Sequence, residues 1–451
     1  MQHLTTDILI IGGGPAAQVT AATALENHPD KSVTVIKKEE VGLVPCGIPY
    51  IFGDTLGSSE KDAMACGGPV AKAVNIIVDE VLDVDIATKY AVAKAHRITF
   101  DKLVFATGSV PFVHENLRGA LALENVFTVD KDKEQIDRIM AYLKGCRRVI
   151  VVGTGFIGVE IAAELRTVDK EVTLVGGRHV LAGSFDADMA GEAGALLEEM
   201  GVNLALGQHA SGVIEASGRA VGVRLCDGSE LEGDAIILAT GYQPNTELAK
   251  KAGFKLTRYG GIWVDEYMRT RDRDVFAVGD CSGRRDFITR APSKVMLAST
   301  SAAEARVAGI SLYGLKHLKG FNGTIAIFST LIGKRAFGCA GVTEDRARQE
   351  KIDYVVGRFE GLNRHPGTIP DASKQSVKLI ALRGSGQIIG GQVIGDKEAG
   401  EMINIIGLAI EAELTAHHLV SLQVATQPLL TAAPTNYPIV KAAQQIVNAM
   451  R

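Results

Sequence analysis

Short apolar runs followed by glycine-rich segments occur twice along the chain. The first run of each copy is almost wholly apolar, which is typical of a strand in a parallel sheet covered on both faces. The stretch after each glycine-rich segment favours a helix, and a second strand-like run follows. The first copy spans residues 7–11, 12–17, 18–26 and 32–36, and the second spans 148–152, 153–158, 159–165 and 171–175. Each copy therefore predicts a βαβ unit.

Two other predicted strands lead into the same three residues, Ala-Thr-Gly. These residues occupy positions 106–108 and 239–241, and a proline follows each within three residues. A third short strand, residues 274–278, leads into Gly279-Asp280. Because this second repeat is interleaved with the first, it predicts two dinucleotide-binding halves, one nested inside the other.

The pattern changes after about residue 321. Strand-like runs at 324–328, 376–382 and 387–394 lead to an apolar helix at 399–412, and no nucleotide loop occurs there. We therefore predict an α/β protein with two nested Rossmann-like dinucleotide-binding domains and a separate C-terminal α+β domain.

Composition and charge narrow the class of protein. The 451 residues are 46% apolar and 5% aromatic, with 50 glycines, which indicates several α/β domains. The net charge is −4 without a dense Lys/Arg stripe, so nucleic acid is not expected as a partner. Glycines at 12–14 interrupt the apolar N-terminal stretch, so we expect neither a signal peptide nor a membrane span. We therefore expect the protein to be cytoplasmic. The six cysteines form no C-x-x-C pair, which predicts neither a metal site nor a disulfide framework.

The two glycine-rich loops predict sites for dinucleotides. Each lies between a strand and a helix, the context in which G-x-G-x-x-G is specific. The first glycine of each loop allows the tight turn, the second lets backbone approach a pyrophosphate, and the third position packs helix on strand. The loop residues proposed to contact cofactor are Gly12, Gly14, Pro15, Ala16 and Ala17 in the first copy and Gly153, Gly155, Phe156, Ile157 and Gly158 in the second.

The acidic residue that usually binds the ribose is absent after both units. Lys37 occupies that place in the first unit, and Gly176 occupies it in the second, where Arg178 follows. Without a carboxylate to repel it, a 2′-phosphate could pair with Arg178, which leans toward NADPH or toward no preference. A solvated basic turn at Arg178 explains the sequence equally well.

Cys46 is the cysteine with a functional context. It lies in 44–50, just after the second strand of the first βαβ unit, so it is expected near the edge of the sheet where ligands bind. Pro49 can begin a short helix, whose N-terminus would favour the thiolate. Val41 and Ile51 stand five positions away on either side, so a local redox disulfide is excluded. The sulfur partner must come from outside, as a mixed disulfide, a persulfide or a sulfenic acid.

The order of these motifs resembles the pyridine nucleotide-disulfide oxidoreductases. Within that family the chain looks like the single-cysteine branch: coenzyme A-disulfide reductases, NAD-dependent persulfide and polysulfide reductases, and NADH oxidases and peroxidases. The resemblance implies FAD as cofactor and NAD(P)H as co-substrate. It also implies an FAD domain at 1–120 and 246–320, an NAD(P) domain at 121–245 and a dimerisation domain at 321–451.

The resemblance also implies roles for individual residues. Asp280 would hold the FAD ribityl chain, and Val81 would meet the adenine through its backbone. Phe156 would cover the flavin until nicotinamide displaces it, and Glu160 would lie beside the nicotinamide; the alternatives are a core aromatic and a solvated helix residue. The remaining cofactor residues implied by the matched motifs are Ala106, Thr107, Gly108, Gly241 and Gly279.

Three positions depart from the family pattern. Lys37 replaces the Glu that binds the FAD ribose, and residues 18–26 carry no cation for the 3′-phosphate of coenzyme A. Gln427-Pro428 replaces the His-Pro of dithiol relatives, so no imidazole base is available there. Tyr437 is a weaker catalytic candidate, because partner-subunit tyrosines serve the site in coenzyme A-disulfide reductases; packing at an interface is the favoured alternative.

These observations predict an FAD-dependent NAD(P)H oxidoreductase that reduces a small disulfide, persulfide or polysulfide through Cys46, as a homodimer. The first alternative is an NAD(P)H oxidase or peroxidase in which Cys46 cycles through a sulfenic acid. The second is a redox-carrier reductase or NAD(P)-responsive flavoprotein that does not need Cys46.

Overall fold

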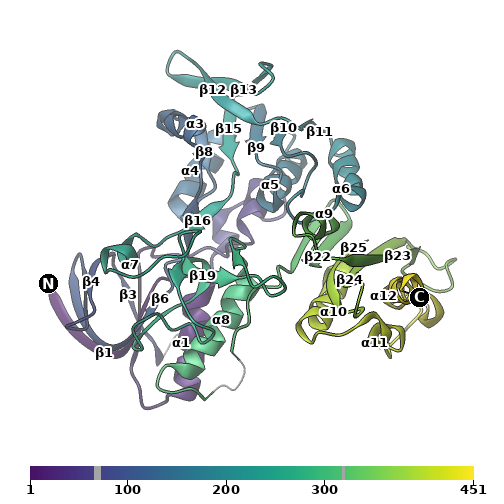
Figure 1. The fold of residues 1–451 in the computed structure, drawn as a ribbon. Coiled ribbons are helices and arrows are strands. Elements are labelled where there is room, and N and C mark those ends of the chain that lie inside the picture. The colour runs from purple at the N-terminus through teal and green to yellow at the C-terminus, as the bar shows by residue number, and fades with distance from the viewer. Residues whose placement is uncertain (65–72, 317–319, 451) are drawn as a thin grey trace. The chain divides into compact units, whose positions relative to one another are not determined.

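The computed structural model describes residues 1–64, 73–316 and 320–450, and these form two compact units. Unit 1 comprises 1–146, 240–286 and 290–324, and unit 2 comprises 147–239, 287–289 and 325–451. Each unit contains one of the two predicted βαβ units (Figure 1). The predicted domain boundaries at 120/121, 245/246 and 320/321 stay predictions.

Unit 1 is built on a seven-stranded sheet in the order β3-β2-β1-β6-β5-β4, with β18 paired to β6. Strands β3, β2, β1, β6 and β18 run parallel, and β5 and β4 continue the sheet antiparallel. The elements of this unit are β1 (Gln2–Ile11), α1 (Pro15–Asn27), β2 (Val33–Lys37), β3 (Asn75–Val78), β4 (Val81–Asp85), β5 (Tyr90–Ala93), β6 (His96–Phe105), β7 (Ser109–Pro111), α3 (Glu115–Arg118), β8 (Val126–Thr128), α4 (Lys133–Leu143), β16 (Tyr242–Pro244), α7 (Glu247–Lys251), β17 (Ile262–Trp263), β18 (Val275–Ala277), β19 (Ser282–Arg285), β20 (Pro292–Ser293) and α8 (Ala298–Ser311).

Helices α1 and α8 lie side by side against this sheet (Figure 1). Their contact is close because both helices present small side chains. A Cβ atom on Gly309 of α8 would lie 2.7 Å from Cβ of Thr23 on α1. The central strands β1 and β6 are buried continuously over their C-terminal residues, 8–11 and 103–105, whereas their N-terminal halves are partly exposed. The buried ends agree with the prediction of a sheet covered on both faces.

The nucleotide-binding part of unit 2 is a second parallel sheet with the order β11-β10-β9-β15. An antiparallel ribbon, β12-β13-β14, projects from it. The elements are β9 (Arg148–Val152), α5 (Phe156–Thr167), β10 (Glu171–Gly176), α6 (Ala187–Glu199), β11 (Val202–Leu206), β12 (Ala210–Ala216), β13 (Arg219–Leu225), β14 (Glu230–Glu232) and β15 (Ala235–Leu238).

The C-terminal part of unit 2 is a five-stranded antiparallel sheet in the order β21-β22-β25-β24-β23. Helices α10 and α12 pack on this sheet and bury an apolar cluster (Figure 1). The elements are β21 (Phe328–Ile332), β22 (Arg335–Gly341), α9 (Glu344–Gln349), β23 (Tyr354–Leu362), β24 (Lys374–Leu382), β25 (Ile388–Gly395), α10 (Ala399–Glu411), α11 (Ala416–Val420) and α12 (Pro438–Ala449).

One strand differs from the prediction. The run 324–328 was expected to be a strand, but β21 begins only at Phe328. Ala326 has a φ of +59°, which ends any extended conformation at that point. The prediction of a strand over 324–327 is therefore wrong.

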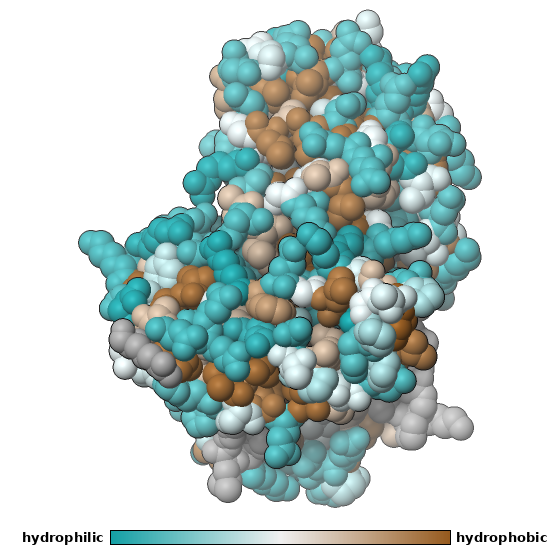
Figure 2. Space-filling model, turned by 90° about the vertical axis from the view of Figure 1, so that its right-hand side faces the viewer, coloured by the Kyte–Doolittle hydropathy of each residue, from teal (hydrophilic) through white to brown (hydrophobic). Residues whose placement is uncertain are grey.

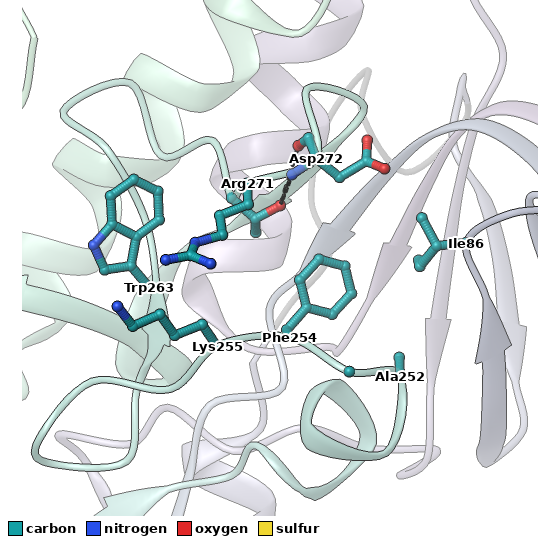
Figure 3. Close-up of a pocket in the computed structure, with 9 residues that line it drawn as sticks. Ile86, Ala252, Phe254, Lys255, Trp263, Arg271 and Asp272 are labelled. Carbon is teal, nitrogen blue, oxygen red and sulfur yellow. Dashed lines mark hydrogen bonds between the residues drawn. The ribbon is translucent and has the colours of Figure 1, made fainter.

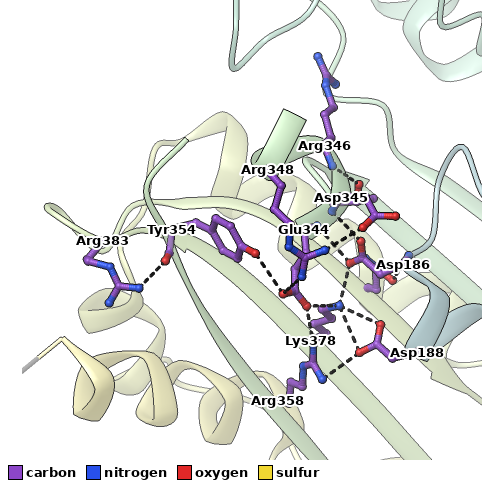
Figure 4. Close-up of polar contacts among 12 residues, drawn as sticks. Asp186, Asp188, Glu344, Asp345, Arg346, Arg348, Tyr354, Arg358, Lys378 and Arg383 are labelled. Carbon is purple, nitrogen blue, oxygen red and sulfur yellow. Dashed lines mark hydrogen bonds and ion pairs between the residues drawn. The ribbon is translucent and has the colours of Figure 1, made fainter. Parts of the chain in front are cut away.

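A buried lysine joins the two parts of unit 2. The Lys378 side chain on β24 is 1% exposed, and its Nζ lies 2.7 Å from Asp186, 3.0 Å from Asp188 and 2.5 Å from Glu344 (Figure 4). Burial alone would lower the pKa of Lys378, but these carboxylates outweigh burial and raise it. The cluster therefore links the nucleotide-binding part to the C-terminal sheet. Because these charges are buried, water screens their attraction only weakly.

The surface carries hydrophilic and apolar side chains intermixed, on the face that Figure 2 presents. Among the helices of the described ranges, none is both long and apolar enough to span a bilayer. Large apolar side chains are exposed on the C-terminal part of unit 2, namely Leu362, Leu408, Leu429 and Leu430.

Candidate cofactor and redox site

The first glycine-rich loop has the backbone that a nucleotide loop needs. Gly12 has a φ of +130°, and a Cβ atom there would lie 2.0 Å from the carbonyl oxygen of Ala106. Gly14 is the N-cap of α1, and nothing lies within 4 Å of the position that its Cβ would take. Pro15 and Ala16 form the first turn, and Ala17 is buried against the sheet. The space above Gly14 lets an anion reach the helix N-terminus, so this loop fits a pyrophosphate.

The Gly279-Asp280 pair lies against this loop. A Cβ atom on Gly279 would lie 2.8 Å from Cβ of Ala16, and the Gly279 amide donates to the Glu304 carboxylate at 2.8 Å. The structure thus brings together two predicted segments that are more than 250 residues apart in sequence. The place where they meet is the candidate FAD site.

Asp280 lies among a hydroxyl and two cations. Ser109 donates to its Oδ2 at 2.8 Å, Lys131 Nζ lies 3.1 Å from that oxygen, and Arg284 lies 3.5 Å from Oδ1. Burial alone would raise the pKa of Asp280, but the charges of Lys131 and Arg284 outweigh burial and lower it. Asp280 is therefore a carboxylate at neutral pH and can accept hydrogen bonds from ligand hydroxyls.

A buried ion pair fixes the turn at Gly279. Arg284 Nε lies 2.8 Å from Glu304, and the two side chains are 2% and 1% exposed. Glu304 also accepts from the Ser282 hydroxyl at 3.1 Å. Removing either charge would strand the other in a buried place, so the network favours one conformation. Sequence reasoning missed Lys131, Arg284 and Glu304 because isolated charged residues carry no spacing signal.

The first Ala-Thr-Gly segment contacts the residues that follow the second one within unit 1. Thr107 Oγ1 donates to the Asn245 carbonyl at 2.5 Å, and the Asn245 amide donates to the Gly108 carbonyl at 2.9 Å. Gly108 and Gly241 have positive φ, and the strands β7 and β16 that follow them pair antiparallel. Val81 begins β4 at the edge of the main sheet.

Cys46 is exposed, in the loop between β2 and a five-residue 3-10 helix, η1 (Ile48–Phe52). The short helix predicted after the cysteine is confirmed, with Pro49 in its first turn. Gly47 is its N-cap. The preference for the thiolate stays a prediction, because so short a helix has a small dipole.

A buried carboxyl lies beside the cysteine loop. Asp62 is 4% exposed, and burial raises its pKa to about 6. A Cβ atom on Gly47 would lie 1.8 Å from Asp62 Oδ1, so the carboxyl fills the space that this glycine leaves. Asp62 Oδ2 has no hydrogen-bond partner within the described ranges. A buried acid next to the residue after Cys46 can hold a proton near the loop, and no sequence pattern marked it.

The other cysteines differ from Cys46 in their burial or in their place in the fold. Cys146, Cys281 and Cys339 are buried and Cys226 is exposed, whereas Cys66 lies outside the described residues. Burial raises the pKa of the Cys281 and Cys339 thiols, which makes them poor nucleophiles.

Lys37 Nζ donates to the Glu40 carbonyl at 2.8 Å, and its stem packs against Gly13. Lys37 thus covers the first turn of the loop.

The second loop repeats the backbone of the first. Gly153 has a φ of +124°, and a Cβ atom on Gly158 would lie 1.8 Å from the Gly153 carbonyl oxygen. Gly155 is the N-cap of α5, and nothing lies within 4 Å of its Cβ position. Ile157 continues the first turn of α5. This loop also fits a pyrophosphate.

Phe156 and Glu160 lie one turn apart on α5, and both contact β21. The Phe156 ring is stacked on Phe328 with a centroid distance of 4.9 Å and an interplanar angle of 9°. The Thr330 hydroxyl donates to Glu160 Oε1 at 2.7 Å. Burial raises the pKa of Glu160 to about 7, and the nearby Glu164 contributes in the same direction. Sequence reasoning identified Phe156 and Glu160 but missed Phe328 and Thr330.

The surroundings of Arg178 and Tyr437 favour a solvated turn for the first residue and packing for the second. The Arg178 side chain is 76% exposed, and its guanidinium lies 3.6 Å from Asp345, which competes with any phosphate. Tyr437 is 7% exposed, in the apolar cluster of the C-terminal part, which favours packing. A preference for NADPH and a catalytic role of Tyr437 stay predictions.

A cavity of about 310 Å³ opens elsewhere in unit 1. Its lining includes Phe254, Lys255, Trp263 and Arg271, and Figure 3 shows the Lys255 and Arg271 side chains near Trp263. None of the predicted site residues lines this cavity. The cavity therefore adds no residue to the candidate site.

Family models of the two parts of the chain match it almost end to end. Residues 6–305 match the pyridine nucleotide-disulphide oxidoreductase model, and residues 327–437 match the dimerisation domain of the same family. The chain belongs to the pyridine nucleotide-disulphide oxidoreductase family. As a member it is an FAD-dependent oxidoreductase that uses NADH or NADPH, and its predicted fold class is confirmed.

Individual relatives carry both activities that the sequence left open. An NADH oxidase of Methanocaldococcus jannaschii is 30% identical over 432 residues, covering 93% of this chain and 94% of the relative. An NAD(P)H coenzyme A polysulfide/persulfide reductase of Pyrococcus horikoshii is 31% identical over 411 residues, covering 87% of this chain and 88% of the relative. The solved NAD-dependent persulfide reductase of A. fulgidus has a TM-score of 0.90 at 28% identity and covers 98% of this chain and 83% of its own.

Proposed function

We propose that the chain reduces a small persulfide, polysulfide or disulfide with electrons from NAD(P)H, through FAD and the sulfur of Cys46. The observation that carries this proposal is the exposed Cys46 in its loop beside the first nucleotide-binding sheet. The names of the sulfur-reducing relatives support the choice of acceptor.

The two loops divide the cofactors between them in this proposal. Gly12, Gly14 and Ala17 form the cradle for the FAD pyrophosphate, and Asp280 accepts hydrogen bonds from its polyol chain. The second loop takes NAD(P)H, with Phe156 and Glu160 facing the nicotinamide. When bound, FAD accepts a hydride from NAD(P)H and delivers two electrons to sulfur.

The residues of the chain provide the sulfur chemistry. The Cys46 thiolate attacks one sulfur of the substrate, a Cys46–sulfur bond forms, and the other sulfur leaves as thiolate or sulfide. Two electrons then break the new bond, which returns the Cys46 thiolate and releases the second sulfur. Protons from NAD(P)H and water balance the two sulfur anions, and the buried Asp62 carboxyl beside Gly47 can hold one of them.

Coenzyme A disulfide is the less favoured acceptor. Its 3′-phosphate needs a cation, and α1 carries no basic residue. Inorganic polysulfide or a small persulfide lacks that requirement. We therefore expect both to be reduced more efficiently than coenzyme A disulfide.

The second candidate function is an NAD(P)H oxidase or peroxidase in which Cys46 forms a sulfenic acid. The names of the oxidase relatives favour this alternative. Stoichiometric uptake of oxygen per NAD(P)H, with no sulfide or thiol product, would distinguish it. We also propose that the chain acts as a homodimer, since its dimerisation domain exposes Leu408, Leu429 and Leu430.

The test is Cys46→Ser with Cys226→Ser as the matched control, because Cys226 is also exposed. The Cys46 variant should keep its FAD and still be reduced by NAD(P)H, whereas sulfur turnover should fall about a hundredfold or more. The control should turn over normally. Parent-level sulfur turnover by Cys46→Ser would contradict the proposal, and mass spectrometry of the parent should find an adduct on Cys46.

A further inference from the structure

Strand β21 of the C-terminal part touches the first turns of α5 with two side chains. Phe328 and Thr330 are two positions apart, so they share one face of the strand. Phe156 and Glu160 are four positions apart, so they share one face of the helix. The two faces meet residue against residue, Phe328 on Phe156 and Thr330 on Glu160.

The aromatic contact restrains the Phe156 ring. Phe328 stacks nearly parallel to it at 4.9 Å, and Phe185 meets it edge-on at 6.5 Å. Phe185 in turn packs on Phe337 of β22 at 6.1 Å. The ring is thus held from the side of the C-terminal sheet, and any movement of Phe156 must break the stack with Phe328.

The polar contact orients the Glu160 carboxyl. Thr330 is buried, and its hydroxyl donates to Oε1 at 2.7 Å. Among the described residues, Thr330 is the hydrogen-bond partner of this carboxyl, and it binds Oε1 and leaves Oε2 without a partner. A β-branched side chain has few rotamers, which makes Thr330 a rigid support.

We propose that Phe328 and Thr330 are positioning residues for the nicotinamide: Phe328 controls how readily Phe156 moves aside, and Thr330 fixes the carboxyl of Glu160 that receives the ring. This inference rests on the proposed function only in that Phe156 and Glu160 face the nicotinamide. It gives the dimerisation domain a part in the nucleotide site of its own chain.

The experiment is anaerobic stopped-flow reduction of the bound flavin by NADH and by NADPH, without any sulfur acceptor. It yields a dissociation constant for the nucleotide and a limiting rate of reduction. Thr330→Val keeps the shape of the side chain but removes the hydroxyl, and it should lower the limiting rate about tenfold. Thr330→Ser should restore the rate to within about threefold of the parent, because it restores the donor.

Phe328→Leu removes the stack and should tighten nucleotide binding about two- to tenfold, since Phe156 then moves aside more easily. Phe328→Tyr should behave like the parent. Ser329→Ala is the matched control, because Ser329 lies between the two residues and is exposed on the other face of β21. Flavin content should be unchanged in all of these variants, and thermal unfolding should show each of them to be folded, with at most a small loss of stability from the lost stack or hydrogen bond.

The outcomes separate the two proposals. If Glu160→Gln and Phe156→Ala change the kinetics but the Phe328 and Thr330 variants do not, the positioning inference is wrong and the site stands. If none of the four residues affects flavin reduction, the placement of the nicotinamide is wrong as well. If Thr330→Ser is as slow as Thr330→Val, the hydroxyl has no positioning role and the inference fails.

Discussion

The two nucleotide loops have nearly the same backbone and very different surroundings. Gly12 and Gly153 have φ values of +130° and +124°, and the N-caps Gly14 and Gly155 have φ values of −76° and −75°. The phosphate-binding turn is therefore a geometry that the glycine spacing produces twice. What each loop can do beyond holding a phosphate depends on the face that its helix presents.

The faces of α1 and α5 differ in their capacity to change. Helix α1 packs closely on α8, where Gly309 meets Thr23, and Asp280 near the loop is held by Lys131 and Arg284. Helix α5 instead presents an aromatic ring and a carboxyl with a pKa of about 7. A rigid, charge-balanced surround suits a cofactor that stays bound. A displaceable ring and a titratable acid suit a co-substrate that enters and leaves.

The largest expected effect on nucleotide binding follows from changing the second glycine of each loop. Gly14→Ala should preserve the fold, since the backbone there is accessible to alanine and the Cβ meets no atom. The methyl group would occupy the space of the pyrophosphate, so FAD affinity should fall about ten- to hundredfold. Gly155→Ala should do the same to NAD(P)H and leave FAD in place.

The ratio of flavin to protein after gel filtration measures the first effect, and nucleotide titration measures the second. Circular dichroism provides the control for folding. Loss of FAD from Gly155→Ala, or retention of full FAD by Gly14→Ala, would show that the loops are assigned to the wrong ligands.

Sequence patterns predicted the loops because their requirements are local. A tight turn, an open N-cap and a close helix each demand glycine or alanine at a fixed spacing, and Gly12, Gly14 and Ala17 provide them. The strands before the loops were predicted for the same reason. Strand β9 (Arg148–Val152) has the predicted bounds.

Contacts between distant segments were not predictable in this way. Thr330 lies 170 positions from Glu160, and Lys131 lies 149 positions from Asp280. Nothing in the neighbouring residues marks either contact. Because Ala326 has a positive φ, β21 begins only at Phe328, the last residue of the predicted run. The sequence therefore did not reveal the strand face that Phe328 and Thr330 share.

The second expected effect is a pH dependence confined to the second loop. Because burial raises the pKa of Glu160 to about 7, its carboxyl is neutral below that pH and charged above it. NAD⁺ carries a positive nicotinamide, so its affinity should rise about tenfold, or about 1.4 kcal/mol, between pH 6 and pH 8. Glu164 is the neighbouring carboxylate, and its charge works against ionisation of Glu160.

Glu160→Gln should remove this dependence and leave the affinity near the value of the parent at low pH. Isothermal titration with NAD⁺ across the pH range measures it without involving Cys46. A parent whose NAD⁺ affinity does not change with pH would show that Glu160 does not face the nicotinamide.

The smallest expected effect concerns the choice between NADPH and NADH at the second loop. Arg178 lies 3.6 Å from Asp345 in an exposed ion pair, and such pairs contribute only about 0–1 kcal/mol. A 2′-phosphate can therefore displace Asp345 from Arg178 at little cost. Asp345→Asn should raise the efficiency with NADPH about two- to fivefold and leave NADH unchanged, whereas Arg178→Gln should lower the NADPH efficiency by a similar factor.

Steady-state kinetics with both nucleotides at low and high ionic strength checks this prediction, because salt should weaken the Arg178 effect. Equal changes for NADH and NADPH would mean that Arg178 belongs to a solvated turn and contacts no phosphate.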